Sequence, residues 1–505
     1  MTTAEAATAD AAHATEAPAR LSAWVGVIAL AQLAVLLATS TRYGYHRDEM
    51  YFIIAGQHPA LGYPDQPLLV PLISAAMNHL VPGSLLVLRA PSALVSAATT
   101  LVAALTTREC AGRGRAQLIA AACTAASGFA LGVGHFVTTS TFDLLSTTLV
   151  CWLVIRAVRR QSGPELLIAG VVTGLGFEAK PQVAFVAVVI VVALALVGPR
   201  WPFRSPWFFG GMAAAAVLAA PYVVWQAAHR WPQFTVVSNV AGSAEGGRAG
   251  FIPFQLVMVS PLLVPVWIAG LIWAWRSTDH TLRFMPVTYG LLVAAYLIEN
   301  GKAYYLASLY PALLGIGAVP TAAWTLRHHA RLRNGLLGAA LAISAAVSAV
   351  LALPLLPVTQ LQGSAVMAVN PDQGETVGWP RFVRTVSTAW QSIPATERAR
   401  TVIFTDNYGE AGAIDLLGGR LELPRAYSGH NALSEWGRPP QRATQVLLIG
   451  YARPAYAGPY FVGCRPVGKI DNGVGLDNDE QGLPLLLCRP AKGWAELWPK
   501  LRHYG

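Results

Sequence analysis

Apolar runs of membrane length recur from residue 21 to residue 356, and short polar connections separate them. A bilayer core of roughly 30 Å needs about 20 apolar residues in one helix. The pattern predicts eleven spanning helices, at 21–39, 86–107, 116–135, 141–157, 165–179, 181–198, 207–228, 255–275, 284–299, 304–325 and 335–356. The shorter apolar stretch 68–81 is bordered or interrupted by prolines, and we expect an interfacial or re-entrant helix there.

The pattern changes after Leu356, where apolar runs shorten and charges of both signs appear. The segments 401–404 and 445–449 are continuous short apolar runs, which is typical of strands buried on both faces. A helix is expected between them, at 410–417. These features predict a small α/β domain at 357–505.

Composition places the chain among polytopic membrane proteins, because 54% of its residues are hydrophobic and only 12% are charged. The formal net charge of +10 largely reflects arginines in alternate connections between the predicted spans. Basic residues collect in cytoplasmic loops, so this charge does not indicate a nucleic-acid partner.

The same arginines predict the orientation. We expect a disordered cytoplasmic tail at 1–20, a membrane domain at 21–356 in the cytoplasmic (inner) membrane, and an extracytoplasmic domain at 357–505. Cys464 and Cys488 both fall in that outer domain, where they are predicted either to pair or to remain small buried residues.

Two adjacent carboxylates, Asp48 and Glu49, follow the first predicted span, within an outer loop at 40–85. Charge beside hydrocarbon is costly unless it is paired or used, so an ionisable cluster there indicates a functional site. Other polar residues are predicted to reach the same external cavity from several spans: His58, Tyr63, Asp65, Arg89, Asp143, Lys180, Lys302, Tyr304 and Tyr305.

Short motifs in this region resemble a known family. They are Arg47–Phe52, Gly62–Leu68, Arg89–Leu94, Phe142–Leu145, Gly174–Lys180 and Gly301–Leu306. Together they are similar to the GT-C glycosyltransferases, in the group of protein O-mannosyltransferases and the lipid A aminoarabinose transferase. The resemblance covers roughly residues 20–325, and it implies an α-helical polytopic GT-C fold with a sugar linked to polyprenyl phosphate as donor.

The resemblance also implies roles for single residues. Asp48 would act as general base on a cell-envelope acceptor, while Glu49 would orient that acceptor or pair with an arginine; the reverse assignment stays open. Arg89, Lys180 and Lys302 would bind the donor phosphate. The residues expected to contact substrate are His58, Tyr63, Asp65, Asp143, Tyr304 and Tyr305. Attack opposite the phosphate implies inversion, and the mechanism requires no metal and no cofactor.

Each role has a structural alternative. Arg89 and Lys180 could be interfacial anchors, Tyr304 and Tyr305 members of an aromatic belt, and Asp143 a helix cap. The acidic pair could serve only to bind Arg47 or Arg89, and the histidines near it could hold a divalent metal.

For the whole protein, the alternative is a transporter or flippase of lipid-linked sugar. The outer domain is expected to select the acceptor, through residues drawn from Asn407, Tyr408, Glu410, His430, Asn431 and Trp436.

Overall fold

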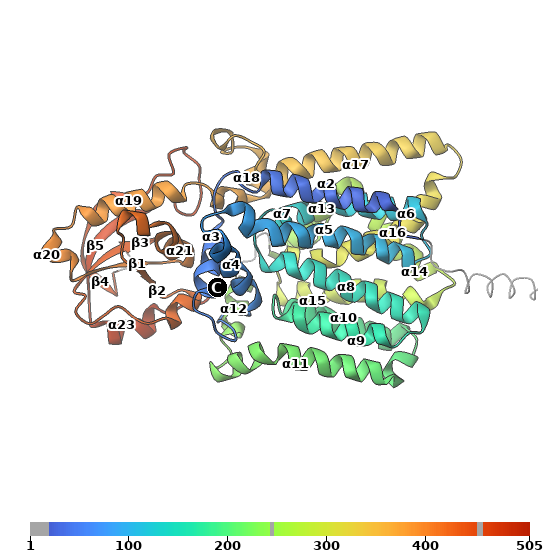
Figure 1. The fold of residues 1–505 in the computed structure, drawn as a ribbon, viewed down its shortest axis with the longest axis horizontal. Helices are drawn as coiled ribbons and strands as arrows, with labels where there is room; N and C mark the ends of the chain where they lie inside the picture. Colours follow the sequence, from blue (N-terminus) through green and yellow to red (C-terminus); the bar gives the residue numbers. More distant parts are fainter. Residues whose placement is uncertain (1–19, 243–246, 452–457) are drawn as a thin grey trace, which may run out of the picture.

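The computed structural model describes residues 20–242, 247–451 and 458–505. Figure 1 shows a bundle of roughly parallel long helices with a smaller, sheet-containing part at one end. The helices α3 (Arg47–Gly56) and α4 (Leu69–Leu80) lie between the two parts. The tail predicted at 1–20 falls outside the described residues, apart from Arg20.

Six helices in the described part are long and apolar enough to cross a bilayer. They are α5 (Leu85–Glu109), α8 (Thr139–Arg160), α11 (Pro206–Ala228), α15 (Phe284–Glu299) with its preceding turn, α16 (Tyr310–Thr325) with the turn η4 (Ala303–Leu309), and α17 (Ala330–Ala352). Two bent pairs raise the number to eight: α6 (Gly114–Ala125) with α7 (Gly128–His135), and α13 (Gly247–Val259) with α14 (Val264–Arg276). The chain is therefore a polytopic membrane protein.

The remaining three predicted spans are apolar helices of 14 to 17 residues: α2 (Ala23–Thr39), α9 (Pro164–Phe177) and α10 (Gln182–Val197). They run beside the longer helices in Figure 1. Every predicted span thus corresponds to an apolar helix, but by length only six to eight of the eleven reach across a bilayer. At 12 residues, α4 is also too short to span.

The described part of the C-terminal region contains one five-stranded sheet, in the order β2-β1-β3-β5-β4. Its strands are β1 (Thr401–Thr405), β2 (Ala426–Ser428), β3 (Gln445–Ile449), β4 (Phe461–Lys469) and β5 (Pro484–Pro490). The strands β2, β1 and β3 are parallel, whereas β5 is antiparallel to β3 and β4. A disulfide joins Cys464 of β4 to Cys488 of β5.

The predicted pair of strands and the helix between them are confirmed as β1, β3 and α21 (Tyr408–Leu417). All five residues of β1 are buried, as the continuous apolar run requires. The other helices of this region are α18 (Ala365–Val369), α19 (Trp379–Gln391), α20 (Ala395–Arg398) and α23 (Trp494–Leu501), and α12 (Pro232–Gly242) follows α11. In Figure 1, α21 lies on the side of the sheet that faces α3.

Candidate active site

The acidic motif forms the first turn of α3. The ring nitrogen Nδ1 of His46 accepts the Asp48 backbone N–H at 3.2 Å, and the Glu49 carboxylate accepts the His46 N–H at 2.9 Å. This reciprocal capping holds both acidic residues at the helix start, where the positive end of the helix dipole favours negative charge. The His46 ring also stacks on Phe136, with centroids 4.8 Å apart.

Glu49 is fully buried and paired with Arg89. The guanidinium donates to both carboxylate oxygens, at 2.8 and 2.7 Å, and the two side chains are 0% and 1% exposed. Arg89 also donates to the carbonyls of Ser40 and Gly44, and Glu49 accepts the Val137 N–H. The guanidinium is thus fully engaged inside the protein, which differs from its expected contact with a donor phosphate.

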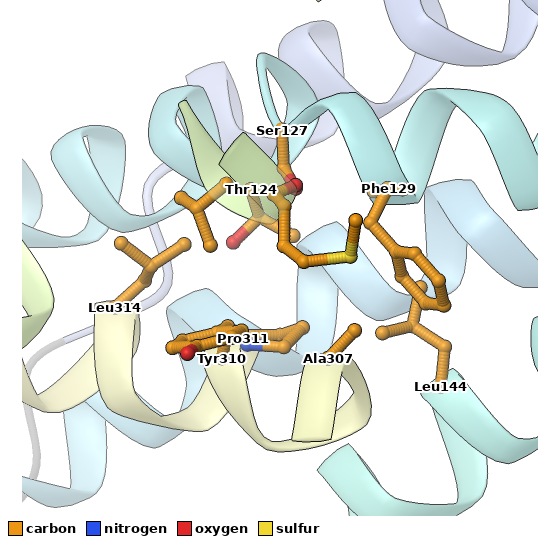
Figure 2. A pocket seen from close by; sticks show the side chains of 11 residues that line it. Thr124, Ser127, Phe129, Leu144, Ala307, Tyr310, Pro311 and Leu314 are labelled. Carbon is orange, nitrogen blue, oxygen red and sulfur yellow. The ribbon is translucent and has the colours of Figure 1, made fainter. Parts of the chain in front are cut away.

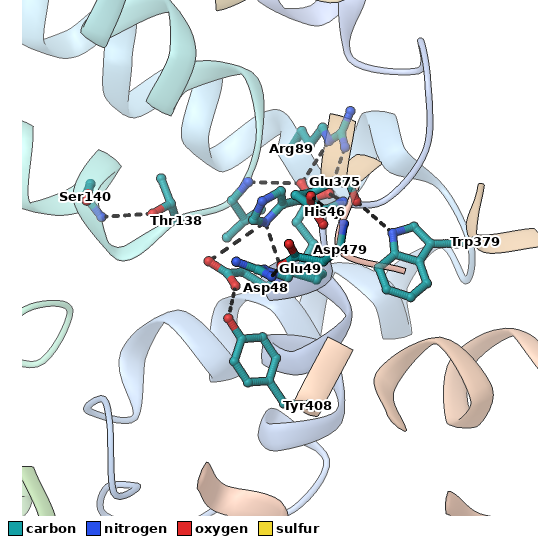
Figure 3. Close-up of polar contacts among 12 residues, drawn as sticks. His46, Asp48, Glu49, Arg89, Thr138, Ser140, Glu375, Trp379, Tyr408 and Asp479 are labelled. Atoms are coloured by element: carbon teal, nitrogen blue, oxygen red, sulfur yellow. Dashed lines mark hydrogen bonds and ion pairs between the residues drawn. The ribbon is translucent and has the colours of Figure 1, made fainter. Parts of the chain in front are cut away.

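Asp48 is in a different environment from its neighbour. Its side chain is 29% exposed, and its Oδ1 accepts the hydroxyl of Tyr408 at 2.8 Å. Its Oδ2 lies 3.8 Å from His46 Nδ1. Figure 3 shows Asp48 pointing away from the Glu49–Arg89 pair and toward Tyr408. The Asp48 carboxylate is therefore partly accessible to solvent, whereas the Glu49 carboxylate is buried and paired.

Lys180 and Lys302 meet at the ring of Tyr304. Their ammonium nitrogens lie 5.1 and 5.9 Å from that ring's centroid, and Lys180 also lies 5.3 Å from the Tyr305 ring. Lys180 donates to the Ser140 hydroxyl at 2.9 Å. Among the described residues, neither ammonium has a carboxylate within ion-pair distance of 4.0 Å, so the positive charge is not neutralised by a direct partner.

Asp143 is the buried acidic residue whose charge acts on Lys180. It is buried, accepts hydrogen bonds from Ser308 and Thr147, and lies in electrostatic range of Lys180. The negative charges of Asp48 and Asp143 both act electrostatically on the Tyr304 hydroxyl. The two lysines thus share one tyrosine ring, on which the charge of Asp48 also acts. Asp143 does not cap α8, because the hydroxyl of Thr138 accepts the N–H at that helix start.

Asp65 connects the loop between α3 and α4 to the C-terminal domain. It accepts the Tyr51 hydroxyl at 2.8 Å and the Asn431 side-chain amide at 3.2 Å. Burial raises the pKa of the Asp65 carboxyl to about 7, and the negative charge of Asp48 acts in the same direction. The Tyr51 ring in turn packs on Tyr408, with centroids 4.7 Å apart.

The contacts that His58 and Tyr63 make are with residues other than Asp48. The His58 ring stacks on Trp436 of the C-terminal domain at 4.2 Å, and the Tyr63 hydroxyl donates to the carbonyl of Ala55 at 2.8 Å. Within the described chain, no three His, Cys, Asp or Glu side chains come together as a metal site would require.

The sequence alone did not single out Ser140 or Ser308, and it indicated Tyr51 only as one of the many polar residues of the first loop, without a role in the site. Serine in a membrane helix is common and carries no distinguishing pattern, so only its contact with Lys180 or Asp143 reveals it. Tyr51 stands three residues after Asp48, one turn along the same helix, and that spacing is a signal that could have included it.

A small void inside the bundle does not belong to this site. It has a volume of about 10 Å³ and lies among Thr124, Ser127, Leu144 and Tyr310 (Figure 2). A single water needs roughly 10–15 Å³, so the void has no room for a sugar or a lipid.

Sequence comparison connects this geometry to known proteins. The profile of the family described as dolichyl-phosphate-mannose-protein mannosyltransferase matches residues 65–225. The match covers less than half of the chain and includes Arg89, Asp143 and Lys180, while Asp48 lies before it. No curated protein sequence matches the chain significantly.

Similar solved structures share the fold at low sequence identity. ArnT from Cupriavidus metallidurans bound to undecaprenyl phosphate is 12% identical with a TM-score of 0.64, over 92% of this chain and 98% of ArnT. The mycobacterial arabinofuranosyltransferase AftD is 14% identical with a TM-score of 0.54, over 94% of this chain and 40% of AftD. An Archaeoglobus fulgidus oligosaccharyltransferase tethered to an acceptor peptide is 12% identical with a TM-score of 0.51, over 89% and 74%. All three have the GT-C architecture, and this chain shares it.

Proposed function

We propose, from the GT-C fold of this polytopic chain and its similarity to protein O-mannosyltransferases and ArnT, that it is an inverting glycosyltransferase. It moves a monosaccharide from a polyprenyl-phosphate donor to a cell-envelope acceptor on the outer side of the cytoplasmic membrane. The domain at 357–505 then lies outside and the N-terminus inside. An arginine network around Glu109, at the end of α5 far from the sheet, supports this orientation.

The observation that carries the proposal is the separation of roles within the acidic pair. The Glu49 carboxylate is paired with Arg89, whereas the Asp48 side chain is partly exposed and accepts one hydrogen bond, from Tyr408. Carboxylates placed in such different environments are typical of a catalytic group beside a positioning group. Asp48 is therefore assigned as the base that removes the proton from the acceptor hydroxyl or amine, and Tyr408 orients it.

Lys180 and Lys302 are assigned to the donor phosphate. As the acceptor attacks the anomeric carbon, the bond from that carbon to the phosphate oxygen breaks and negative charge accumulates on the leaving group. Two ammonium groups without a direct counter-ion are suited to stabilise that charge. Arg89 acts as a positioning residue, because its guanidinium holds Glu49 and the loop carbonyls.

Asp48→Asn is expected to lower sugar transfer by roughly 10²–10⁴-fold, because the amide cannot accept a proton. The fold should survive, since the amide oxygen still accepts from Tyr408. The measurement is transfer of radiolabelled sugar from a polyprenyl phosphate donor by purified protein in vesicles. Asp477→Asn, at an exposed position of the outer domain, is the matched control. Wild-type protein that carries the lipid across the vesicle membrane without cleaving the sugar–phosphate bond would instead favour a transporter.

Lys180→Met is expected to weaken binding of polyprenyl phosphate about tenfold or more, because one of two fixed charges facing the phosphate is lost. Binding is measured by titration of the purified protein with undecaprenyl phosphate. Lys492→Met, on the outer domain surface, should leave the affinity unchanged. An unaltered affinity in the Lys180 variant would assign this lysine to membrane anchoring.

A further inference from the structure

A second cavity, of about 400 Å³, lies where three distant segments meet. The segment between α3 and α4 contributes His58 and Tyr63, the outer end of α11 contributes Trp225 and His229, and the outer domain contributes Glu435 and Trp436. Its volume falls within the roughly 300–1,000 Å³ of ordinary small-molecule sites. His58, His229 and Glu435 are exposed, so the cavity opens to the outside solution.

Two aromatic stacks form part of its lining. Trp436 stacks on His58 at 4.2 Å, and Trp225 stacks on His229 at 3.9 Å, each with an interplanar angle of 12°. Both tryptophans are only partly buried, so ring surface remains for a ligand. Flat aromatic rings suit a ligand that has an apolar face together with polar edges.

Three polar side chains in the lining, His58, His229 and Glu435, present hydrogen-bond acceptors. The Nδ1 atoms of His58 and His229 contact the carbonyls of Ile54 and Trp225, at 3.0 and 2.8 Å. A carbonyl can only accept, so Nδ1 carries the proton and Nε2 of each neutral ring is left as an acceptor. Glu435 uses Oε1 for Arg502 and Tyr504, which leaves Oε2 available.

No lysine or arginine lines the cavity among the described residues. A phosphate or sulfate group would meet a carboxylate and two lone pairs there, so an anion is disfavoured. A ligand rich in hydroxyl donors satisfies all three acceptors, and the C–H face of its ring can pack on tryptophan.

We propose that this cavity binds one sugar ring of an acceptor glycan, which rests on the proposed function. The cavity is separated from the catalytic base by a short series of contacts. Ala432, in the cavity wall, donates its N–H to the Tyr51 hydroxyl at 3.2 Å, and the Tyr51 ring packs on Tyr408, the partner of Asp48.

The test is saturation-transfer NMR on the full chain in a sugar-free detergent, with mannotriose and arabinotriose as pyranose and furanose probes. At least one trisaccharide is expected to receive saturation on its ring C–H protons. Trp225→Ala and Trp436→Ala should each weaken that binding by about tenfold, because each removes one stacking surface. Trp24→Ala, at an exposed position of α2, is the matched control.

Binding is measured in parallel with the Asp48→Asn variant, so the result does not depend on transfer. Glycan binding that persists in this variant supports the subsite even if no transfer is found. The proposal is overturned if neither trisaccharide receives saturation. It is also overturned if both tryptophan variants bind the trisaccharide as tightly as the wild type while having the same melting temperature. Competition by inorganic pyrophosphate at equal strength would likewise overturn it, since an anion would then be the preferred ligand.

Discussion

Glu49 and Arg89 form a buried ion pair directly beside Asp48. Their bidentate contact is buried, and each also bonds backbone groups, of the segment between α2 and α3 or of the α7–α8 connection. A buried pair of this kind contributes little against a well-packed apolar substitute, but removal of one member leaves an uncompensated charge in the interior. The pair therefore fixes the position of α3, and Asp48 with it.

Arg89→Met is expected to lower the free energy of unfolding by about 3–5 kcal/mol, because Glu49 is left buried without a partner. The effect should appear as a lower midpoint in thermal unfolding of the purified protein. Arg42→Gln, an exposed arginine that precedes the same motif, should melt like the wild type. If the Arg89→Met protein is as stable as the wild type but binds undecaprenyl phosphate more weakly, Arg89 would instead be assigned to binding of the donor phosphate.

Two helices from distant parts of the chain, α3 and α21, meet beside Asp48. The first turn of α21 packs on α3, and two glycines make the close approach feasible. A Cβ at Gly409 would lie 2.7 Å from the Cβ of Arg47, and one at Gly412 would lie 3.1 Å from the Cβ of Met50. Asn407 and Glu410 form a capping box at the start of α21, which sets the orientation of Tyr408. The helix pair thus connects the outer domain directly to Asp48.

Gly409→Ala is expected to reduce sugar transfer by roughly tenfold or more. Alanine favours a helix over glycine, so the loss would come from the collision with Arg47, which displaces Tyr408 from Asp48. The transfer assay compares it with Gly419→Ala, at a position just after α21 where an added Cβ meets open space. Equal rates for Gly409→Ala and wild type would show that the contact between the helices has no catalytic consequence.

The region where the membrane domain meets the C-terminal domain contains several buried carboxyl groups. Burial raises the pKa of Glu410 to about 8, and the like charges of Asp406 and Asp479 add to this. Glu375 and Glu480 show raised pKa values for the same main reason. With Asp65, these groups hold protons in the folded state that the unfolded chain releases near its ordinary pKa of about 4.

Stability is therefore expected to fall as pH rises from about 4 to 8, by about 1.4 kcal/mol per pH unit for each proton that only the folded state retains. Below that window both states are protonated, and above it both are ionised. The measurement is thermal unfolding between pH 4 and pH 8.5. Glu410→Gln keeps the capping geometry without a titrating group and should flatten part of the slope. A wild-type stability that increases over this range would contradict the assignment.

Local pattern was sufficient for much of this molecule. Apolar runs predicted the membrane helices, since a segment without polar side chains is stable only away from water, and short buried runs predicted β1, β3 and α21. The same reasoning failed on length, because α2, α9 and α10 end before about 20 residues. The acidic motif and the lysines were recognised as candidates from their place at the ends of apolar runs.

Sequence by itself determined the class of the protein, the order of its two parts and the set of charged residues at their border. Only the tertiary structure decided which of these charges pair. It placed Arg89 on Glu49 and both lysines around Tyr304, and it brought Tyr408 to Asp48 across 360 positions of chain. The physical reason is that hydropathy acts on each segment separately, whereas ion pairs and hydrogen bonds depend on distances that exist only after the segments pack.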